Sequence, residues 1–310
     1  MVNKGSISIT GATGFVGINL KKYLSDAYEI NSMSVRFIDN QELKIQGNAI
    51  IHLAGKAHDL KKVSNPQDYY EANFELTKQL FDAFLNSETE VFIFMSTVKA
   101  VADEVEGILN EDTKPNPKTH YGISKYQAEQ YILSKEILTG KRVYILRPCM
   151  IHGPDNKGNL NLLYKVVSKR FPWPLGGFHN QRSFLSIENL CFVIKELLEN
   201  KSIPCGVYQV ADDIPLSTND LIQLLGNSLD KKSNIWNIPV SWVKAVAKLG
   251  DVLYLPLNSE RLQKLTENYI VSNQKIVAAI GKSLPVSAED GLMRTFESFR
   301  KNIKINSINK

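Results

Sequence analysis

The sequence predicts a doubly wound α/β fold, in which one parallel sheet carries helices on both faces. Two observations lead to this prediction. Short apolar runs of strand length recur along the chain, and stretches with apolar residues at three- and four-residue spacing separate them. Strands and helices that alternate in this way form parallel sheets through crossover connections. The expected strands are 6–10, 30–35, 49–53, 90–95, 143–146 and 207–210, and the expected helices are 16–25, 66–85 and 124–138.

The regular alternation ends after Pro148, where prolines and glycines break the pattern. A second, smaller lobe of mixed helices and strands is expected to begin near Gly153. Residues 183–210 again contain a helix and a strand pattern, so the chain is expected to return to the first lobe there. We therefore predict a first domain of residues 1–152, rejoined at about 183–210, and a second lobe of residues 153–182 and 211–310.

Length and composition limit the classes of protein. The 310 residues are 43% apolar, which is enough for a sizeable core. Lys and Arg outnumber Asp and Glu by 37 to 32, an excess too small and too scattered for a nucleic-acid surface. No apolar run approaches the roughly 18 residues of a membrane span. The longest, residues 235–255, is interrupted by charges and predicts an amphipathic helix instead. With no secretory signal pattern at the start, we expect a cytoplasmic protein with neither a nucleic-acid nor a membrane partner.

The cysteines and histidines give no sign of a metal site. Cys149, Cys191 and Cys205 form no CxxC pair, and the five histidines never fall at the spacing of metal ligands. We expect reduced thiols and no bound metal.

A glycine-rich loop follows the first expected strand and opens a helix. Glycine permits a positive φ and a close approach of ligand to backbone. The N-terminus of the helix offers free N–H groups and a partial positive charge to a pyrophosphate, while the last glycine allows the helix to pack tightly on the strand. This order of elements predicts a dinucleotide site. The expected cofactor contacts in the loop are Gly11, Thr13, Gly14, Phe15, Val16 and Gly17.

The end of the second strand indicates which dinucleotide is preferred. An acidic residue there usually meets the ribose of NAD, and a basic residue matches the 2′-phosphate of NADP. Ser34 and Arg36 stand at this place, whereas Asp39 comes three residues later. We expect Ser34 and Arg36 to contact the cofactor, with NADP(H) preferred and NAD(H) as the alternative.

Two Tyr-x-x-x-Lys matches are present, Tyr121 with Lys125 and Tyr131 with Lys135. Tyr121 follows Pro117 and opens an expected helix, which places Lys125 one turn along on the same face. Tyr131 lies within the helix, where packing accounts for it. A neighbouring ammonium favours the phenolate of a tyrosine, whose ordinary pKa is near 10. Tyr121 and Lys125 therefore form a candidate acid–base pair.

Hydroxyl groups at Ser96 and Thr97 follow the fourth strand, at the carboxyl edge of the sheet where ligands bind in doubly wound folds. Together with the GxxGxxG loop and the Tyr/Lys pair, they resemble the extended short-chain dehydrogenase/reductases. Leu53-Ala-Gly55, Asn73 and the segment 146–154 extend the resemblance over most of the chain, although members usually carry Tyr where His152 stands.

The resemblance implies a Rossmann-type sheet that binds the dinucleotide and a smaller lobe that binds the substrate. It selects Thr97 over Ser96, because the catalytic hydroxyl of the family lies three residues before the position of Ala100. It implies Thr97, Tyr121 and Lys125 as the catalytic residues, and Leu53, Ala54, Gly55, Tyr121, Lys125 and Pro148 as further cofactor contacts.

Downstream segments resemble the nucleotide-sugar branch of this family. That likeness implies Asn159, Leu160, Arg182 and Thr97 as contacts of a nucleotide-diphosphate sugar, with the guanidinium on the phosphates. The acid usually found directly after the arginine is absent. The likeness also implies a homodimer, formed through the helices near 70–85 and 124–138.

The two residues after Thr97 narrow the choice of reaction. The 4,6-dehydratases of the branch carry Asp and Glu there, whereas this chain has Val98 and Lys99, which leaves C4 reduction or C4 epimerisation. The chain resembles UDP-glucose 4-epimerase-like proteins, which include UDP-4-keto-6-deoxy-N-acetylhexosamine 4-reductases. With Arg36, we favour reduction of a UDP-4-keto-6-deoxy sugar in surface polysaccharide biosynthesis. The alternative is a UDP-glucose or UDP-N-acetylglucosamine 4-epimerase. A non-catalytic NADP(H) sensor is the remote alternative, since such proteins typically lose the Tyr/Lys pair.

Overall fold

The computed structural model describes residues 4–57, 65–156, 158–253 and 258–308. Its centre is a six-stranded sheet with the order β2-β1-β3-β4-β6-β9, and every neighbouring pair is parallel. All six strands coincide with predicted ones, so the predicted doubly wound fold is confirmed. The strands are β1 (Ser6–Thr10), β2 (Glu29–Met33), β3 (Ala49–His52), β4 (Val91–Met95), β6 (Arg142–Pro148) and β9 (Gly206–Val210).

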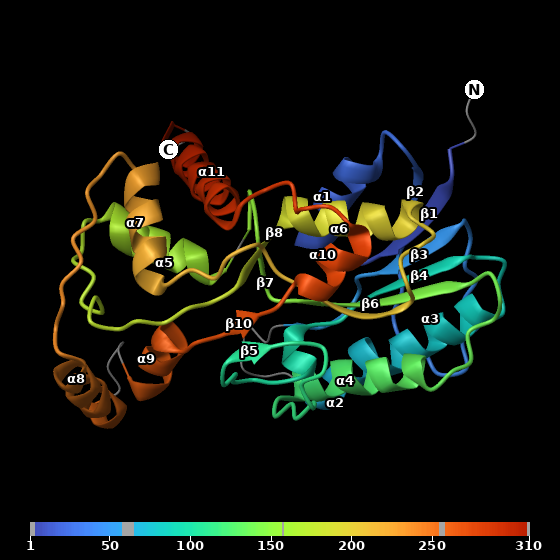
Figure 1. The fold of residues 1–310 in the computed structure, drawn as a ribbon, viewed down its shortest axis with the longest axis horizontal. Helices are drawn as coiled ribbons and strands as arrows, with labels where there is room; N and C mark the ends of the chain where they lie inside the picture. The colour runs from blue at the N-terminus through green and yellow to red at the C-terminus, as the bar shows by residue number, and fades with distance from the viewer. Residues whose placement is uncertain (1–3, 58–64, 157, 254–257, 309–310) are drawn as a thin grey trace.

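Helices cover both faces of this sheet (Figure 1). In β4, Val91, Ile93 and Met95 belong to the core on one face, and Phe92 and Phe94 belong to the core on the other. Strands buried on both sides are continuous apolar runs, as the sequence of β4 shows. The first face carries α1 (Phe15–Leu24), α6 (Ile187–Glu199) and α10 (Gln274–Ile280), and the second carries α2 (Gln67–Tyr70), α3 (Leu76–Leu85) and α4 (His120–Leu133).

The remaining elements form a smaller lobe beside the carboxyl edge of the sheet (Figure 1). Its separate apolar core draws on residues between Leu160 and Phe299. Two short parallel pairs flank it, β7 (Met150–His152) with β8 (Phe184–Ser186) and β5 (Ile108–Leu109) with β10 (Ile270–Val271). The helices of this lobe are α5 (Asn159–Ser168), α7 (Thr218–Ser228), α8 (Val240–Leu253), α9 (Ser259–Thr266) and α11 (Ala288–Ile308).

Several predicted boundaries differ from the observed ones. The second strand ends at Met33 rather than 35, and the helix predicted at 124–138 is α4, which begins at His120 and ends at Leu133. The helix predicted at 66–85 is interrupted by one turn of π-helix, η1 (Glu71–Glu75). Single π turns inside α-helices are frequent at functional sites.

The turn between β1 and α1 leaves no room for a side chain at its last glycine. A Cβ atom on Gly17 would lie 2.4 Å from the carbonyl oxygen of Gly11 and 2.7 Å from the Cα of Ala12, and both neighbours are backbone. Gly17 therefore lets α1 pack directly against the turn that precedes it. A Cβ on Gly14, in the same loop, would meet only the Gly11 oxygen, at 3.4 Å.

We predict that Gly17→Ala lowers the free energy of unfolding by about 1–3 kcal/mol, as expected when a methyl group is forced into a packed site. Helix propensity alone would predict a gain, since Ala is favoured over Gly in a helix by about 1 kcal/mol. Urea denaturation without added cofactor measures the change. Gly14→Ala is the matched control, and an equal loss in both variants would contradict the packing explanation.

Candidate functional site

The strand order changes direction between β1 and β3, and the loops that follow these two strands meet there. Gly11 has a φ of +67°, and a Cβ on it would lie 2.8 Å from the amide nitrogen of Ala54. Gly14 is the N-cap of α1, and no side chain caps this helix, so its first N–H groups are available to an anion. The structure thus brings the glycine loop and the segment Leu53–Gly55 together at the place where doubly wound folds bind ligands.

A buried polar chain holds these two loops together. The Oγ1 atom of Thr10 accepts hydrogen bonds from the amides of Leu53 and Ala54, each at 3.1 Å, and lies 2.7 Å from Nδ1 of His52. The other ring nitrogen of His52 lies 2.9 Å from Oγ1 of Thr77. Burial, reinforced by the charge of Lys125, holds the pKa of His52 well below its usual value. Sequence reasoning missed this histidine, whose only signal was its place at a strand end.

Lys125 projects from α4 to the same edge of the sheet. Its side chain is buried, with Nζ donating to the carbonyl oxygen of Met95 at 2.9 Å and lying 4.7 Å from the centre of the Phe94 ring. A Cβ on Gly55 would come within 3.1 Å of this Nζ, so the glycine allows the loop after β3 to pass beside the ammonium. Burial lowers the pKa of Lys125 to about 8, against the opposing effect of Glu129. The ammonium is therefore retained at neutral pH.

Asn73, in the π turn, fastens the loop after β3 to α4. Its Nδ2 donates to Oγ of Ser124 and to the carbonyl oxygen of Lys56, each at 3.0 Å, while its Oδ1 accepts from the Lys56 amide at 2.8 Å. The π turn contains Asn73, and the side-chain amide of this residue is fully buried. The sequence singled out Asn73 only by resemblance, since the pattern of apolar residues does not reveal a π turn.

Tyr121 lies in the first turn of α4, which Thr119 caps by accepting a hydrogen bond from the amide of Gly122. Burial raises the pKa of the Tyr121 phenol, and a hydrogen bond with the side chain of Thr97 opposes this effect. Thr97 is itself nearly buried at the end of β4. The structure therefore brings Thr97, Tyr121 and Lys125 together at one sheet edge. There the phenol of Tyr121 can donate or accept a proton, beside the hydroxyl of Thr97 and the ammonium of Lys125.

The second Tyr/Lys match serves the packing of helices. The hydroxyl of Tyr131 donates to Oδ1 of Asp82 at 2.6 Å, which joins α4 to α3. Burial and this carboxylate raise the pKa of Tyr131. Lys135 follows the end of α4 and lies over the Tyr131 ring.

A buried ion pair lies one helical turn beyond Lys125. The guanidinium of Arg147, on β6, donates to both carboxylate oxygens of Glu129 on α4, with distances of 2.5 to 3.1 Å. The hydroxyl of Ser96 donates to the same carboxylate. Glu129 and Arg147 are almost fully buried, so this contact sets the position of α4 against the ends of β4 and β6. Sequence reasoning missed it, because neither residue forms a recognised motif.

The other residues expected at the cofactor surround this edge. Ser34 and Arg36 are exposed just beyond the end of β2, and within the described chain Arg36 has no hydrogen-bond or ion-pair partner. Pro148 is the last residue of β6 and is buried. Thr13 and Gly14 are exposed at the tip of the glycine loop, and Phe15 and Val16 are partly buried.

The residues expected at the substrate lie in the smaller lobe. The guanidinium of Arg182 donates to the carbonyl oxygen of Lys264 at 2.6 Å and lies 3.4 Å from the carboxylate of Glu267. Leu160 is buried in the core of the lobe, so only its backbone can meet a ligand. Asn159 is the first residue of α5, and its side chain lies outside the described part of the structure.

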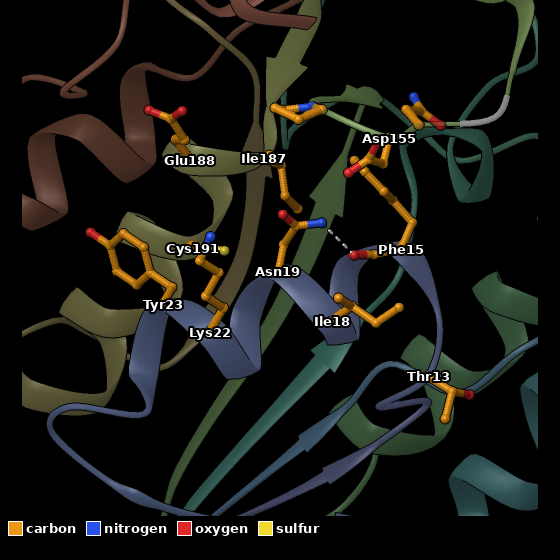
Figure 2. Close-up of a pocket in the computed structure, with 12 residues that line it drawn as sticks. Thr13, Phe15, Ile18, Asn19, Lys22, Tyr23, Asp155, Ile187, Glu188 and Cys191 are labelled. Carbon is orange, nitrogen blue, oxygen red and sulfur yellow. Dashed lines mark hydrogen bonds between the residues drawn. The ribbon is translucent and has the colours of Figure 1, made fainter. Parts of the chain in front are cut away.

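A hollow of about 940 Å³ lies between α1, α6 and residues 154–156 (Figure 2). Thr13 and Phe15 connect it to the glycine loop, but Thr97, Tyr121 and Lys125 do not line it. Gly153 packs between Phe15 and Ile187. The hollow therefore borders the glycine loop and does not contain the tyrosine and lysine.

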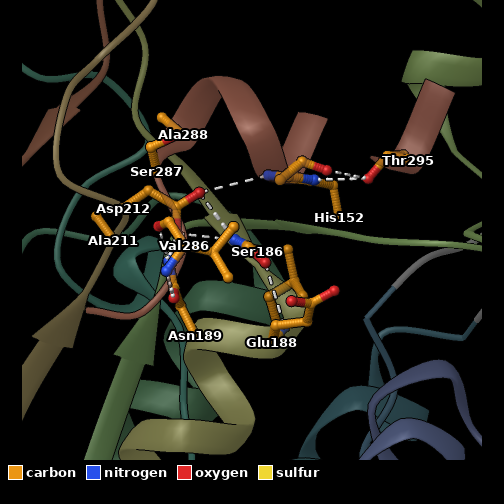
Figure 3. A network of polar contacts seen from close by, with 12 residues as sticks. His152, Ser186, Glu188, Asn189, Ala211, Asp212, Val286, Ser287, Ala288 and Thr295 are labelled. Atoms are coloured by element: carbon orange, nitrogen blue, oxygen red, sulfur yellow. Dashed lines mark hydrogen bonds and ion pairs between the residues drawn. The ribbon is translucent and has the colours of Figure 1, made fainter. Parts of the chain in front are cut away.

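His152 belongs to a buried network between the lobes (Figure 3). Its Nδ1 lies 2.9 Å from Oγ1 of Thr295 on α11, and its Nε2 lies 3.5 Å from a carboxylate oxygen of Asp212. Asp212, just after β9, also accepts from the amide of Ser186 and the side chain of Asn189. His152, which stands where the resemblance led us to expect a tyrosine, thus lies between the end of β9 and α11.

The described ranges contain neither a cluster of metal ligands nor a helix that could span a membrane. Nowhere in these ranges do three or more His, Cys, Asp or Glu side chains gather to hold a metal ion. None of the helices in the described ranges is long and apolar enough to cross a membrane.

Several known proteins are similar to this chain in sequence or in fold. The chain is 29% identical to a Vibrio cholerae protein named UDP-glucose 4-epimerase, over 95% of both chains. It is 27% identical to the N-acetyl-alpha-D-glucosaminyl-diphospho-ditrans,octacis-undecaprenol 4-epimerase of Escherichia coli O157:H7, over 94% of both chains. It is 25% identical to a GDP-6-deoxy-D-mannose reductase of Pseudomonas aeruginosa, over 71% of this chain and 78% of that one.

A solved structure of RMD from Pseudomonas aeruginosa, complexed with NADPH, has the same fold, with a TM-score of 0.70 and 20% identity over 96% of this chain and 100% of the other. The model of the NAD dependent epimerase/dehydratase family matches residues 7–211. These residues include the glycine loop, the loop after β3, and Thr97, Tyr121 and Lys125. The chain therefore belongs to the NAD-dependent epimerase/dehydratase family.

Proposed function

We propose that this enzyme reduces the C4 ketone of a UDP-linked 4-keto-6-deoxy sugar, with NADPH as the preferred hydride donor. The observation that carries the proposal is the convergence of Thr97, Tyr121 and Lys125 beside the glycine loop. Val98 and Lys99, which follow Thr97, offer no pair of carboxylates for removing water from a sugar. The ammonium of Lys99 instead donates to the carbonyl oxygen of Asp103. Carbonyl chemistry at C4 fits this set of groups.

The residues present fit a dinucleotide. The uncapped start of α1 offers N–H groups to a pyrophosphate, and Gly55 keeps the space beside Lys125 free of a side chain. We assign Gly11, Thr13 to Gly17, Leu53 to Gly55 and Pro148 to cofactor binding, with Ser34 and Arg36 at the adenosine end. When bound, the nicotinamide supplies the hydride that reduces the C4 carbon.

Tyr121 acts as the general acid in this proposal. It donates its proton to the C4 oxygen as that oxygen becomes an alcohol, while Thr97 donates a hydrogen bond to the same oxygen and orients it. Because burial raises the pKa of Tyr121 in the free protein, the neutral phenol that a reduction consumes is the resting form. The retained charge of Lys125 stabilises the phenolate left after transfer.

The smaller lobe is proposed to hold the sugar nucleotide. Arg182, kept in place by Glu267 and the Lys264 carbonyl, is assigned to the diphosphate, for which a guanidinium is suited. In this division, residues 1–152 and 183–210 bind the dinucleotide, and residues 153–182 and 211–310 bind the sugar, except that α10 within the second range packs on the sheet. The product is proposed to supply surface polysaccharide synthesis from the cytoplasm, and the enzyme to act as a homodimer through α3 and α4.

Epimerisation at C4 is the second candidate. Two relatives that match nearly the whole chain are named 4-epimerases, one of a UDP-sugar and one of a sugar on undecaprenol diphosphate. The same three residues serve that reaction, because a 4-epimerase makes a C4 ketone and then reduces it. Arg36, a basic residue suited to the 2′-phosphate of NADPH, favours reduction.

We predict that Tyr121→Phe lowers kcat by about 10²–10⁴-fold, the contribution typical of a general acid, with little change in the Kd of NADPH. The ring is retained and only the transferable proton is lost. Tyr131→Phe is the matched control, since it removes a hydroxyl of the other Tyr/Lys match on the same helix. A greater loss of kcat in Tyr131→Phe would refute our choice of pair.

The reaction itself is tested with purified protein. We expect one NADPH to be oxidised for each UDP-4-keto-6-deoxy sugar reduced, as followed by absorbance, and little nicotinamide to remain bound through purification. Interconversion of UDP-glucose and UDP-galactose, or of their N-acetylated forms, without added cofactor would establish the epimerase instead. Turnover of about 1 s⁻¹ or faster lies in the usual range for enzymes and would decide between the two.

The preference for NADP(H) rests on Arg36. We predict that Arg36→Asp raises the Kd of NADPH more than tenfold and changes that of NADH less, because a guanidinium pairs with a 2′-phosphate. Fluorescence titration of both cofactors measures the two constants. Parallel changes in the two Kd values would show that Arg36 takes no part in the preference.

A further inference from the structure

The backbone of Lys99 is packed between Thr97 and the first turn of α4. Its amide donates to Oγ1 of Thr97 at 3.2 Å, within the short 3₁₀ turn η2 (Val98–Ala100) that follows β4. A Cβ atom on Gly122, the residue after Tyr121, would lie 2.4 Å from the carbonyl oxygen of Lys99. The backbone of Lys99 is therefore held beside both of the hydroxyl residues assigned to the C4 oxygen.

The side chain of Lys99 extends from this place to the smaller lobe. Its Nζ donates to the carbonyl oxygen of Asp103 at 2.6 Å and lies 4.4 Å from the centre of the Tyr269 ring. Tyr269 directly precedes β10 and pairs with Arg182 through a β-bridge. Arg182 is also close enough for its charge to act on the ammonium of Lys99. The side chain thus leads from the sheet edge to the surroundings of the arginine assigned to the diphosphate.

This course places Lys99 beside the proposed position of the sugar. Thr97 is assigned to the C4 oxygen and Arg182 to the diphosphate, so the sugar ring lies between these two residues. The backbone of Lys99 adjoins the first of them, and its ammonium lies near the second. A nucleotide sugar that reaches both residues therefore passes the side chain of Lys99.

The ammonium of Lys99 retains donors for a ligand. A lysine ammonium carries three N–H donors, and the carbonyl of Asp103 accepts one of them. Among the residues that the structure describes, Lys99 has no second hydrogen-bond acceptor and no ion-pair partner. Its side chain is only partly buried, so the remaining donors can reach a molecule bound between the lobes.

The charges around Lys99 favour a neutral acceptor. Three carboxylates and one guanidinium act on its ammonium, namely Asp103, Glu104, Glu267 and Arg182. Burial lowers the pKa of Lys99, and the carboxylates oppose this effect. A further anionic group beside Lys99 would be repelled by these carboxylates. A hydroxyl or acyl oxygen would not, and it accepts a strong hydrogen bond from a charged donor.

We propose that Lys99 is a substrate-binding residue, whose ammonium donates a hydrogen bond to a hydroxyl or acyl oxygen of the sugar while Thr97 and Arg182 hold its two ends. The inference rests on the proposed UDP-sugar substrate. It holds for reduction and for epimerisation at C4, because both reactions place the same sugar between the same residues. Lys99 then recognises the sugar and not the nucleotide.

The proposal is tested by calorimetric titration of the full-length protein, with saturating NADP⁺ present, using UDP and UDP-N-acetylglucosamine as the two ligands. Lys99→Met should raise the Kd of UDP-N-acetylglucosamine roughly tenfold or more, the loss typical of one hydrogen bond from a charged donor. The Kd of UDP should not change, because UDP carries no sugar. Arg182→Gln should weaken the binding of both ligands, because its contact is with the phosphates.

Lys118→Met is the matched control. It removes the same charge from the same part of the chain, and its Nζ donates only to the exposed side chain of Asn116. This variant should bind both ligands like the parent. If circular dichroism shows that Lys99→Met does not fold, Lys99→Gln, which keeps a polar side chain, takes its place with the same two expectations.

Three outcomes overturn the assignment of Lys99. An unchanged Kd of UDP-N-acetylglucosamine in the Lys99 variant would show that the ammonium does not contact the sugar. Equal weakening of UDP and UDP-N-acetylglucosamine would show that Lys99 only holds the smaller lobe in place through Tyr269. Binding of neither ligand by the parent would overturn the UDP-sugar substrate proposed above, and this assignment with it.

Discussion

The buried ion pair between Glu129 and Arg147 is the contact on which the arrangement of the site depends. It ties α4 to β6, and through the hydroxyl of Ser96 it also ties α4 to the end of β4. Two charges buried away from water are stable only when they pair with each other. Removing one partner of such a pair typically lowers the stability of the folded protein by about 3–5 kcal/mol. The helix therefore has little freedom to slide or rotate on the sheet. Since Tyr121 and Lys125 lie on this helix, the same pair sets where they meet the sheet edge.

The ammonium of Lys125 imposes a second condition on its surroundings. A buried charge has to be satisfied by hydrogen bonds or by charge, and here the carbonyl of Met95, the ring of Phe94 and the nearby Glu129 do so. The lowered pKa shows that the compensation is incomplete. A glycine at position 55 and a π turn at Asn73 are the local adjustments that let the neighbouring backbone pass. The regular backbone geometry is thus altered at the residues that surround Lys125.

The smaller lobe is attached by polar contacts as well as by its own core. His152, Asp212 and Thr295 connect β7, the end of β9 and α11 in a region shielded from water. Such contacts orient the lobe toward the sheet edge, where the phosphates assigned to Arg182 must meet the carbonyl assigned to Tyr121.

The sequence by itself determined the six strands and the order of strand, glycine loop and helix, and it predicted Tyr121 rather than Tyr131 as the acid–base residue. These follow from local patterns: apolar alternation, glycine spacing and a tyrosine at the start of a helix. The tertiary structure alone decided which residues complete the site. Glu129 and Arg147 are 18 residues apart, and His52 meets Thr10 and Thr77 across 42 and 25 residues, so no local pattern could pair them. The π turn at Asn73 was likewise hidden, because the pattern of apolar residues does not reveal a π turn.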